Sequence, residues 1–278
     1  MAGSPGFNGD LTDDLPYGRV MRQDSVSISR FYSSPLGQAA GRVLAQRILD
    51  LWPQADGLSL LGVGFPQPVL DPFADSARRL VVALPEAAGH DRWDATGRGN
   101  ATVIGPEARL PFPDGLFDRV IVLHGMEEAG HPRAVCREIW RVMAPEGRII
   151  VALANRAGLW SRAERTPFGH GRPWTKRQIA SLLGDCTFQV TASTHALYMP
   201  PIPSGLIGSG AEGWERAGAF LAPALGGVVL VEAVKRLYVE PGGGAVAPAL
   251  SAVKARKGRA GMPTDRAGQC PGDRREGS

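Results

Sequence analysis

Residues 118–153 read DRVIVLHGMEEAGHPRAVCREIWRVMAPEGRIIVAL, and this stretch decides the fold class. The apolar run at 118–123 predicts a buried strand, and Pro132 opens a segment whose apolar residues recur at helical spacing. A turn at 144–147 leads into a second apolar run at 148–153. Strand, helix and strand in this order are typical of a parallel sheet with covered faces.

The same alternation continues on both sides of this unit. Ser34-Pro35 is an N-cap followed by proline, and it predicts a helix over 35–51. We also expect a crossover helix at 75–79, a helix at 175–183 that begins with a capping box, and strands at 58–63, 80–84, 101–104, 187–193 and 227–237. The sequence therefore predicts one α/β domain over residues 25–240.

The two ends of the chain have a different composition. Residues 1–24 are rich in Gly, Asp and Pro, and 12 of the 38 residues at 241–278 are Gly or Pro, with no aromatic residue among them. We expect both segments to be disordered. The formal net charge of +4 is carried by residues 254–278, where seven basic residues face three acidic ones. A charged tail without aromatic residues or a fold signature predicts no nucleic-acid partner.

Composition excludes several classes of protein. With 44% hydrophobic and 21% charged residues, the chain is neither fibrous nor wholly disordered. Cys136, Cys186 and Cys270 are widely spaced, and no cysteine or histidine pattern has the spacing of a metal site, so we predict no metal. No leader-like pattern opens the chain, and no apolar stretch reaches the length of a membrane helix. These features predict a cytoplasmic protein without a membrane span.

The first predicted strand ends in glycines, in the sequence Gly62-Val63-Gly64-Phe65-Pro66. Glycine lets a ligand approach the backbone, and ligands of open α/β sheets bind where strands end. The segment lacks both the dinucleotide fingerprint and the P-loop pattern. It predicts either a ligand site or a tight turn.

Two motifs narrow the choice. LPFPDGLFDRVIV at 110–122 and REIWRVMAPEGR at 137–148 resemble the class I S-adenosylmethionine-dependent methyltransferases, in particular the type 11 group that includes quinone-biosynthesis enzymes. The resemblance spans residues 58–183 and extends to Tyr238, and an uncharacterised bacterial subgroup has a similar loop at 155–174. It implies a Rossmann-like doubly wound, mostly parallel seven-stranded sheet with helices on both faces and an antiparallel final strand. It also implies S-adenosyl-L-methionine as the cofactor.

The resemblance assigns site residues as well. The cofactor is expected over Gly62 and Gly64, with Glu86 as the candidate for the ribose hydroxyls and Glu107 near the adenine amine. Both carboxylates are shifted by one or two positions from the family pattern. His124, after the strand at 118–123, is the candidate for both cofactor contact and proton transfer. The alternative is a histidine that bonds a backbone carbonyl.

The loop at 155–174 combines arginines with aromatic residues. Arg156, Arg165 and Arg172 suit a carboxylate or phosphate, and Trp160 suits a flat or apolar body. We expect this loop to cover the site and to bind an anionic, partly apolar small-molecule acceptor, with His170 as a second catalytic candidate. The alternative is that the Arg and Trp side chains simply hold a long crossover segment against the domain.

The predicted function is thus methyl transfer from S-adenosylmethionine to a small molecule. Two alternatives stay open because the glycine loop departs from the family pattern. One is a degenerate methyltransferase fold that binds or regulates without catalysis, and the other is an α/β protein for a different nucleotide-like ligand. The sequence predicts neither the acceptor atom nor an oligomeric state.

Overall fold

The computed structural model describes residues 23–86, 93–94, 99–202 and 210–237. Its centre is one seven-stranded sheet with the order β3-β2-β1-β4-β5-β7-β6. The strands are β1 (Ser59–Gly64), β2 (Arg79–Pro85), β3 (Thr102–Gly105), β4 (Phe117–Leu123), β5 (Met143–Ala154), β6 (Phe188–Ala196) and β7 (Val228–Lys235). β1 to β5 are parallel, and β7 pairs antiparallel with both β5 and β6. The predicted mostly parallel sheet is confirmed.

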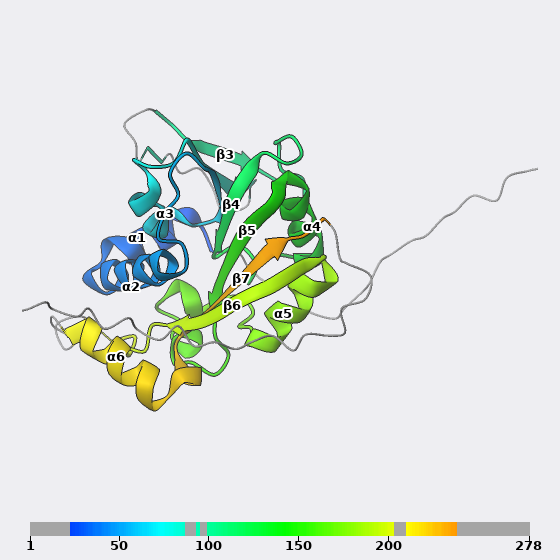
Figure 1. Ribbon diagram of the computed structural model, residues 1–278. Helices are drawn as coiled ribbons and strands as arrows, with labels where there is room; N and C mark the ends of the chain where they lie inside the picture. Colours follow the sequence, from blue (N-terminus) through cyan, green and yellow to red (C-terminus); the bar gives the residue numbers. More distant parts are fainter. Residues whose placement is uncertain (1–22, 87–92, 95–98, 203–209, 238–278) are drawn as a thin grey trace, which may run out of the picture.

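Helices cover both faces of this sheet, as Figure 1 shows. One face carries α1 (Ser25–Ser33), α2 (Pro35–Leu51) and α3 (Gln67–Leu70), and the other carries α4 (Pro132–Val142) and α5 (Lys176–Asp185). A further helix, α6 (Ala211–Leu221), precedes β7, and short 3₁₀ turns lie at Asp71–Phe73, Trp160–Arg162, Pro167–Gly169 and Pro223–Leu225.

The sheet separates two apolar cores. Along β1, Leu60 belongs to the core under α1 to α3, whereas Leu61 belongs to the core under α4 and α5. All six residues of β1 are buried, as are all eight of β7. Strands buried on both faces read as continuous apolar runs, which explains why the sequence located them.

Two sequence-predicted helix starts are confirmed in detail. The Ser34 hydroxyl accepts a hydrogen bond from the Gly37 amide at 3.1 Å, with Pro35 in the first turn of α2. The Thr175 side chain accepts from the Gln178 amide, and the Gln178 side chain accepts from the Thr175 amide, which completes the capping box of α5.

The predicted crossover helix at 75–79 is wrong. The connection from β1 to β2 holds only the four-residue α3 and the turn at Asp71–Phe73, and residues 74–76 form a turn. α3 ends at Leu70, and Pro72 has no amide hydrogen with which to continue its ladder. Helices α1 and α6 were not expected from the sequence, and each buries few side chains.

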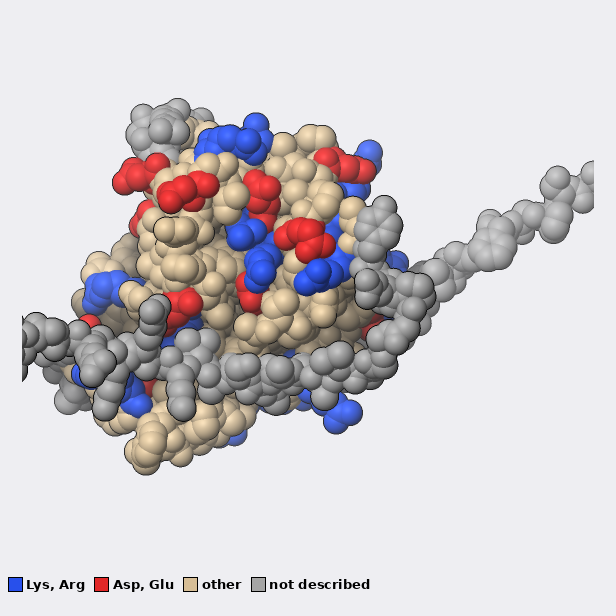
Figure 2. Space-filling view, in the orientation of Figure 1, with Lys and Arg blue, Asp and Glu red and all other residues tan. Residues whose placement is uncertain are grey.

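The predictions for the chain ends lie outside the described residues. Residues 1–22 and 238–278 are not among them, so the boundaries 1–24, 25–240 and 241–278 stay predictions. On the face shown in Figure 2, acidic and basic side chains of the described residues lie interspersed. Arg141, for example, bonds both Asp114 and Glu138. The expectation of no nucleic-acid partner also stays a prediction.

A buried carboxylate lies in the middle of β7. Glu232 is 5% exposed, and its Oε1 accepts hydrogen bonds from the Trp52 indole at 2.8 Å and from Arg148 at 2.9 Å. Its Oε2 accepts from the Thr191 hydroxyl at 2.7 Å. These bonds join β7 to the end of α2, to β5 and to β6.

We expect Glu232→Ala to lower the free energy of unfolding by about 2–3 kcal/mol, because the buried Trp52 indole loses its acceptor and two partly buried donors, Arg148 and Thr191, lose theirs. Urea denaturation measures this change. Glu164→Ala is the matched control, because Glu164 is exposed, and it should change stability by less than about 0.5 kcal/mol. Equal effects of the two substitutions would contradict the role of Glu232.

Candidate functional site

The candidate site lies where β1, β2 and β4 end side by side. These strands are parallel, so Gly64, Pro85 and Leu123 share the carboxyl edge of the sheet, and His124 follows directly. Ligands of open α/β sheets bind at this edge. The sequence located the edge correctly, at the glycine segment and at His124.

Both predicted glycines are required by contacts within the protein. Gly64 has a φ of 89°, and a Cβ there would collide with the Leu123 carbonyl and with the backbone of Gly125. A Cβ on Gly62 would collide with the Pro66 ring. The two glycines therefore allow the tight turn after β1 and its contact with the segment after β4.

Aromatic side chains fill the space over these strand ends. The Tyr32 ring from α1 stacks on Phe65, with centroids 6.1 Å apart and planes 9° apart. The Tyr32 hydroxyl lies 2.9 Å from Nε2 of His124, and the His124 ring lies 4.7 Å from the centroid of Phe168. We call these side chains the aromatic cluster, together with the neighbouring rings of Phe31 and Trp160.

His124 is held in an uncommon conformation and stays neutral. Its φ is 52°, a value that few non-glycine residues adopt. Burial lowers its pKa to about 3. A pKa near neutrality was the reason to consider it for proton transfer, and the buried environment removes that reason. The observed partner is the hydroxyl of Tyr32, not a backbone carbonyl.

Glu127 is a buried carboxyl that the predicted site did not include. It is 4% exposed, its Oε1 accepts from the Ala154 amide at 3.3 Å, and its Oε2 has no hydrogen-bond partner among the described residues. Burial raises its pKa to about 7. The sequence does place Glu127 and Glu128 after the strand, but nothing there indicates which of the two is buried.

The cavity left at the strand ends is small. It measures about 10 Å³ and is lined by Gln23, Ile28, Gly64, Phe65, Pro85, His124 and Glu128. That is about the space of one water molecule. Ile28 of α1 closes it on one side, together with Gln23 just before this helix, whose amide donates to Glu128 at 3.0 Å. We call this place the crevice.

Neither of the two predicted cofactor carboxylates lines the crevice. Glu86 follows Pro85 at the end of β2 and is exposed. Glu107 lies half-buried in the turn after β3. Glu128 is the carboxylate that lines the crevice among the described residues.

The loop at 155–174 bonds mainly to backbone carbonyls. Trp160 is fully buried, and its indole donates to the Met199 carbonyl at 2.8 Å. Arg156 donates to the Pro173 carbonyl, and Nε2 of His170 lies 2.7 Å from the Glu164 carbonyl. These contacts fit the alternative of a loop held against the domain, and the substrate role of Trp160 stays a prediction.

The other predicted loop residues lie away from the crevice lining. Arg165 and Arg172 are exposed, and the Arg172 amide donates to the Glu127 carbonyl at 2.9 Å. Phe168, which the predicted site omitted, is the loop residue that contacts His124. Its burial depends on rings from α1, which a single sequence does not show.

Neither a metal-binding cluster nor a membrane-spanning helix occurs among the described residues. No group of three or more His, Cys, Asp or Glu side chains that could hold a metal ion occurs there. Within the same residues, no helix has the length and apolar character needed to cross a membrane.

Comparison with known proteins identifies the central unit. Residues 70–151, which run from α3 to β5, match the family described as "Methyltransferase domain". Over these residues the chain is similar to that family. The match includes both motifs that carried the resemblance in the sequence, and it confirms the family that they indicated.

Solved structures share the fold. A possible histamine N-methyltransferase from Thermotoga maritima, described as SAM-dependent, has a TM-score of 0.54 at 17% identity, over 75% of this chain and 94% of its own. The [4+2]-cyclase SpnF has a TM-score of 0.50 at 21% identity, over 73% of this chain and 83% of its own. At these identities the likeness shows the fold alone.

The curated relatives align with only part of this chain. A demethylmenaquinone methyltransferase from Renibacterium salmoninarum is 31% identical over 115 residues, which is 41% of this chain and 44% of the relative. Other relatives align at 25% identity over 212 residues, about two thirds of this chain and of their own length.

The methyltransferase domain and its fold imply S-adenosylmethionine as the cofactor. The crevice in its present conformation does not fit this molecule. Small-molecule sites commonly enclose roughly 300–1,000 Å³, whereas the crevice holds about 10 Å³. The groups that fill it are the protein's own Ile28, Phe65 and His124. Any nucleoside ligand at this edge requires α1 and these side chains to move.

The pKa of Glu127 generates a prediction about stability. In an unfolded chain this carboxyl titrates near 4.5, and in the folded protein near 7. Between these pH values the folded protein keeps a proton that the unfolded chain has lost, so its stability falls as the pH rises. We expect Glu127→Gln to gain about 1.4 kcal/mol over the wild type for each pH unit in this window.

Urea denaturation of both proteins at three pH values across the window measures this difference. The lowered pKa of His124 acts in the opposite direction, because stability from that group is lost as the pH falls. That contribution is common to both proteins and cancels in their difference. A difference that stays constant with pH would contradict the raised pKa of Glu127.

Proposed function

We propose that this protein is an S-adenosylmethionine-dependent methyltransferase that acts on a small-molecule acceptor at the carboxyl edge of β1 and β4. The proposal rests on the match of residues 70–151 to the methyltransferase family model. These residues belong to a seven-stranded sheet with the order β3-β2-β1-β4-β5-β7-β6. The printed activity of the Renibacterium relative, a demethylmenaquinone methyltransferase, supports a small molecule as the acceptor.

The chain's own residues supply an environment from which water is excluded. Phe65 is 5% exposed and Phe168 is 1% exposed, and both lie over the strand ends. Methyl transfer depends on positioning and on the exclusion of water more than on a single catalytic group. The aromatic cluster supports a partly apolar acceptor. The expectation of an anionic group on the acceptor is based on Arg156, Arg165 and Arg172, and these residues do not line the crevice.

Helix α1 controls access in this proposal. Its Tyr32 hydroxyl bonds His124, its Ile28 lines the crevice, and the Tyr32 ring stacks on Phe65. Opening the crevice breaks these contacts, and their free energy is subtracted from that of ligand binding. The affinity for the cofactor therefore depends on how strongly α1 is held.

A second candidate function has an observation in its favour. The crevice is filled, and both glycines are explained by internal contacts. A methyltransferase fold kept for binding or regulation without catalysis would show these features. The fold also occurs in a protein described as a cyclase, so the architecture alone does not determine the reaction.

Calorimetry of the full chain with S-adenosylmethionine and S-adenosylhomocysteine separates the two functions. We expect saturable micromolar binding of both, as for an enzyme that binds cofactor and product. Absence of binding by either compound at millimolar concentration would overturn the methyltransferase proposal and favour the second function.

The substitution Tyr32→Phe tests the role of α1. Removing the hydroxyl breaks one hydrogen bond worth about 1 kcal/mol, so S-adenosylhomocysteine should bind about fivefold more tightly. Tyr198→Phe is the matched control, because its hydroxyl also donates a hydrogen bond, to the Pro223 carbonyl at 2.7 Å, and it does not line the crevice. Equal affinities for the wild type and Tyr32→Phe would contradict the coupling.

A further inference from the structure

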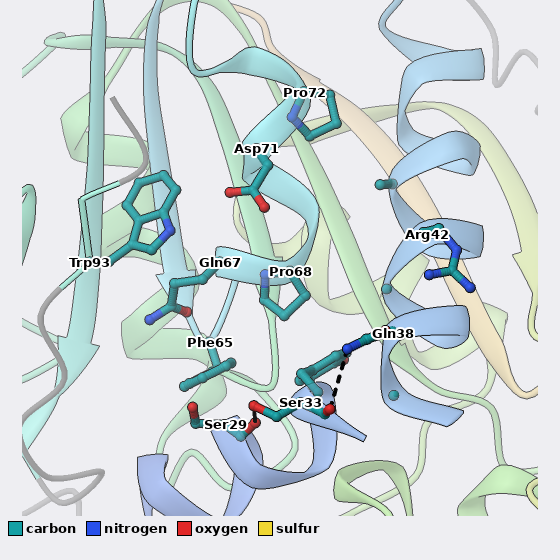
Figure 3. Close-up of a pocket in the computed structure, with 14 residues that line it drawn as sticks. Ser29, Ser33, Gln38, Arg42, Phe65, Gln67, Pro68, Asp71, Pro72 and Trp93 are labelled. Atoms are coloured by element: carbon teal, nitrogen blue, oxygen red, sulfur yellow. Dashed lines mark hydrogen bonds between the residues drawn. The ribbon is translucent and has the colours of Figure 1, made fainter. Parts of the chain in front are cut away.

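A larger cavity lies on the other side of the Phe65 ring. It measures about 580 Å³ and runs between α2 on one side and α3 with the turn at Asp71–Phe73 on the other, as Figure 3 shows. We call it the α2–α3 groove. Its α2 wall includes Gly37, Gly41 and Ala45, which leave space open because glycine has no side chain and that of alanine is a single methyl group. Phe65 lines both this groove and the crevice.

The groove contains a buried amide without a partner. Gln67, the first residue of α3, is 8% exposed, and neither its Nε2 nor its Oε1 has a hydrogen-bond partner among the described residues. In Figure 3 its side chain is seen between those of Trp93 and Phe65. A buried amide without hydrogen bonds costs about 1–3 kcal/mol. A ligand that offers a donor next to an acceptor would remove this cost.

Two opposite charges line the same groove. Within the part of the chain that the structure describes, neither Asp71 nor Arg42 forms an ion pair or a hydrogen bond that would occupy its charge. Burial raises the pKa of Asp71. One carboxylate and one guanidinium suit a ligand that is neutral overall and carries hydroxyl or carbonyl groups.

Flat aromatic surfaces complete the groove. Trp93 is anchored beside β3, because its amide donates to the Thr102 hydroxyl at 3.1 Å and its carbonyl accepts from the Ala101 amide at 3.0 Å. The Trp93 and Phe65 rings both line the cavity. Rings of this kind stack on planar heterocycles.

We propose that the α2–α3 groove binds a nucleobase or nucleoside, read by the Gln67 amide and stacked against Trp93. Glutamine pairs in two hydrogen bonds with a base edge that carries a donor beside an acceptor. The volume of the groove lies in the usual range for small-molecule sites. This site is separate from the crevice, and it does not depend on the proposed methyl transfer.

The test uses the full chain and four probes: adenosine, guanosine, cytidine and uridine. Calorimetry should show saturable binding of at least one of them. Gln67→Leu should weaken that binding at least about tenfold, because the two hydrogen bonds to the base are lost. Gln189→Leu is the matched control, since Gln189 is exposed on β6, and it should leave the affinity unchanged.

A second readout separates ligand binding from a structural role of Gln67. Replacing a buried amide that has no partner by an apolar side chain is close to neutral or stabilising, so the melting temperature of Gln67→Leu should not fall. If the variant nevertheless unfolds, Trp93→Ala provides an independent test, because it removes the stacking surface and should also weaken binding.

Three results would overturn the proposal. The first is that no nucleoside binds at millimolar concentration. The second is binding that survives both Gln67→Leu and Trp93→Ala. The third is that S-adenosylhomocysteine competes with the nucleoside and also no longer binds to Gln67→Leu. In that case the groove would be the cofactor's own site. Failure of S-adenosylhomocysteine to bind at all would affect the proposed function and leave this inference standing.

Discussion

The hydrogen bond between Tyr32 and His124 joins the N-terminal helix to the central strand of the sheet, and the arrangement of the site depends on it. The two side chains are 92 positions apart in the chain, and their polar atoms are 2.9 Å apart. The bond places the Tyr32 ring flat on Phe65, and it keeps Ile28 over the ends of β1 and β4. Both side chains are half-buried, and the bond gives each polar atom a partner.

The open space near the strand ends is divided unequally between the two sides of Phe65. The central strand–helix–strand unit lies within the residues that match the methyltransferase family model, in a mostly parallel sheet. The connection after β1, however, is reduced to a four-residue helix and a turn. The shortened connection and the small residues of α2 border the α2–α3 groove, while Phe65 and α1 fill the crevice. In this structure the larger space therefore lies on the α2–α3 side of Phe65, and the crevice on its other side is small.

Much of the fold could be predicted from the sequence, because its signals are local. The buried runs at 58–63 and 148–153, the capping box at Thr175 and the N-cap at Ser34 depend on residues close together in the chain. The crossover between β1 and β2 could not, because residues 75–79, expected as a helix, run from a turn to the first residue of β2. Helix α1, which buries only Ser25 and Ile28, was also not expected.

The position of the site could be predicted, but its contents could not. Gly64 and His124 lie at the expected edge because parallel strands end together there. The filling of that edge depends on Tyr32 and Phe168, which reach it from distant segments. The sequence does not show the burial of Trp160 either, because an aromatic residue in a polar loop is compatible both with ligand binding and with packing in the core, where the structure has it. Gln67 gave no signal, since only burial reveals that its amide lacks a partner.

Hydrogen–deuterium exchange of the full chain with and without saturating S-adenosylhomocysteine tests the central claim most directly. If α1 closes the crevice that the cofactor must enter, amides of residues 25–33 should exchange faster in the presence of the compound, while those of β1 become no less protected. Binding of the compound with unchanged or slower exchange in α1 would contradict the account.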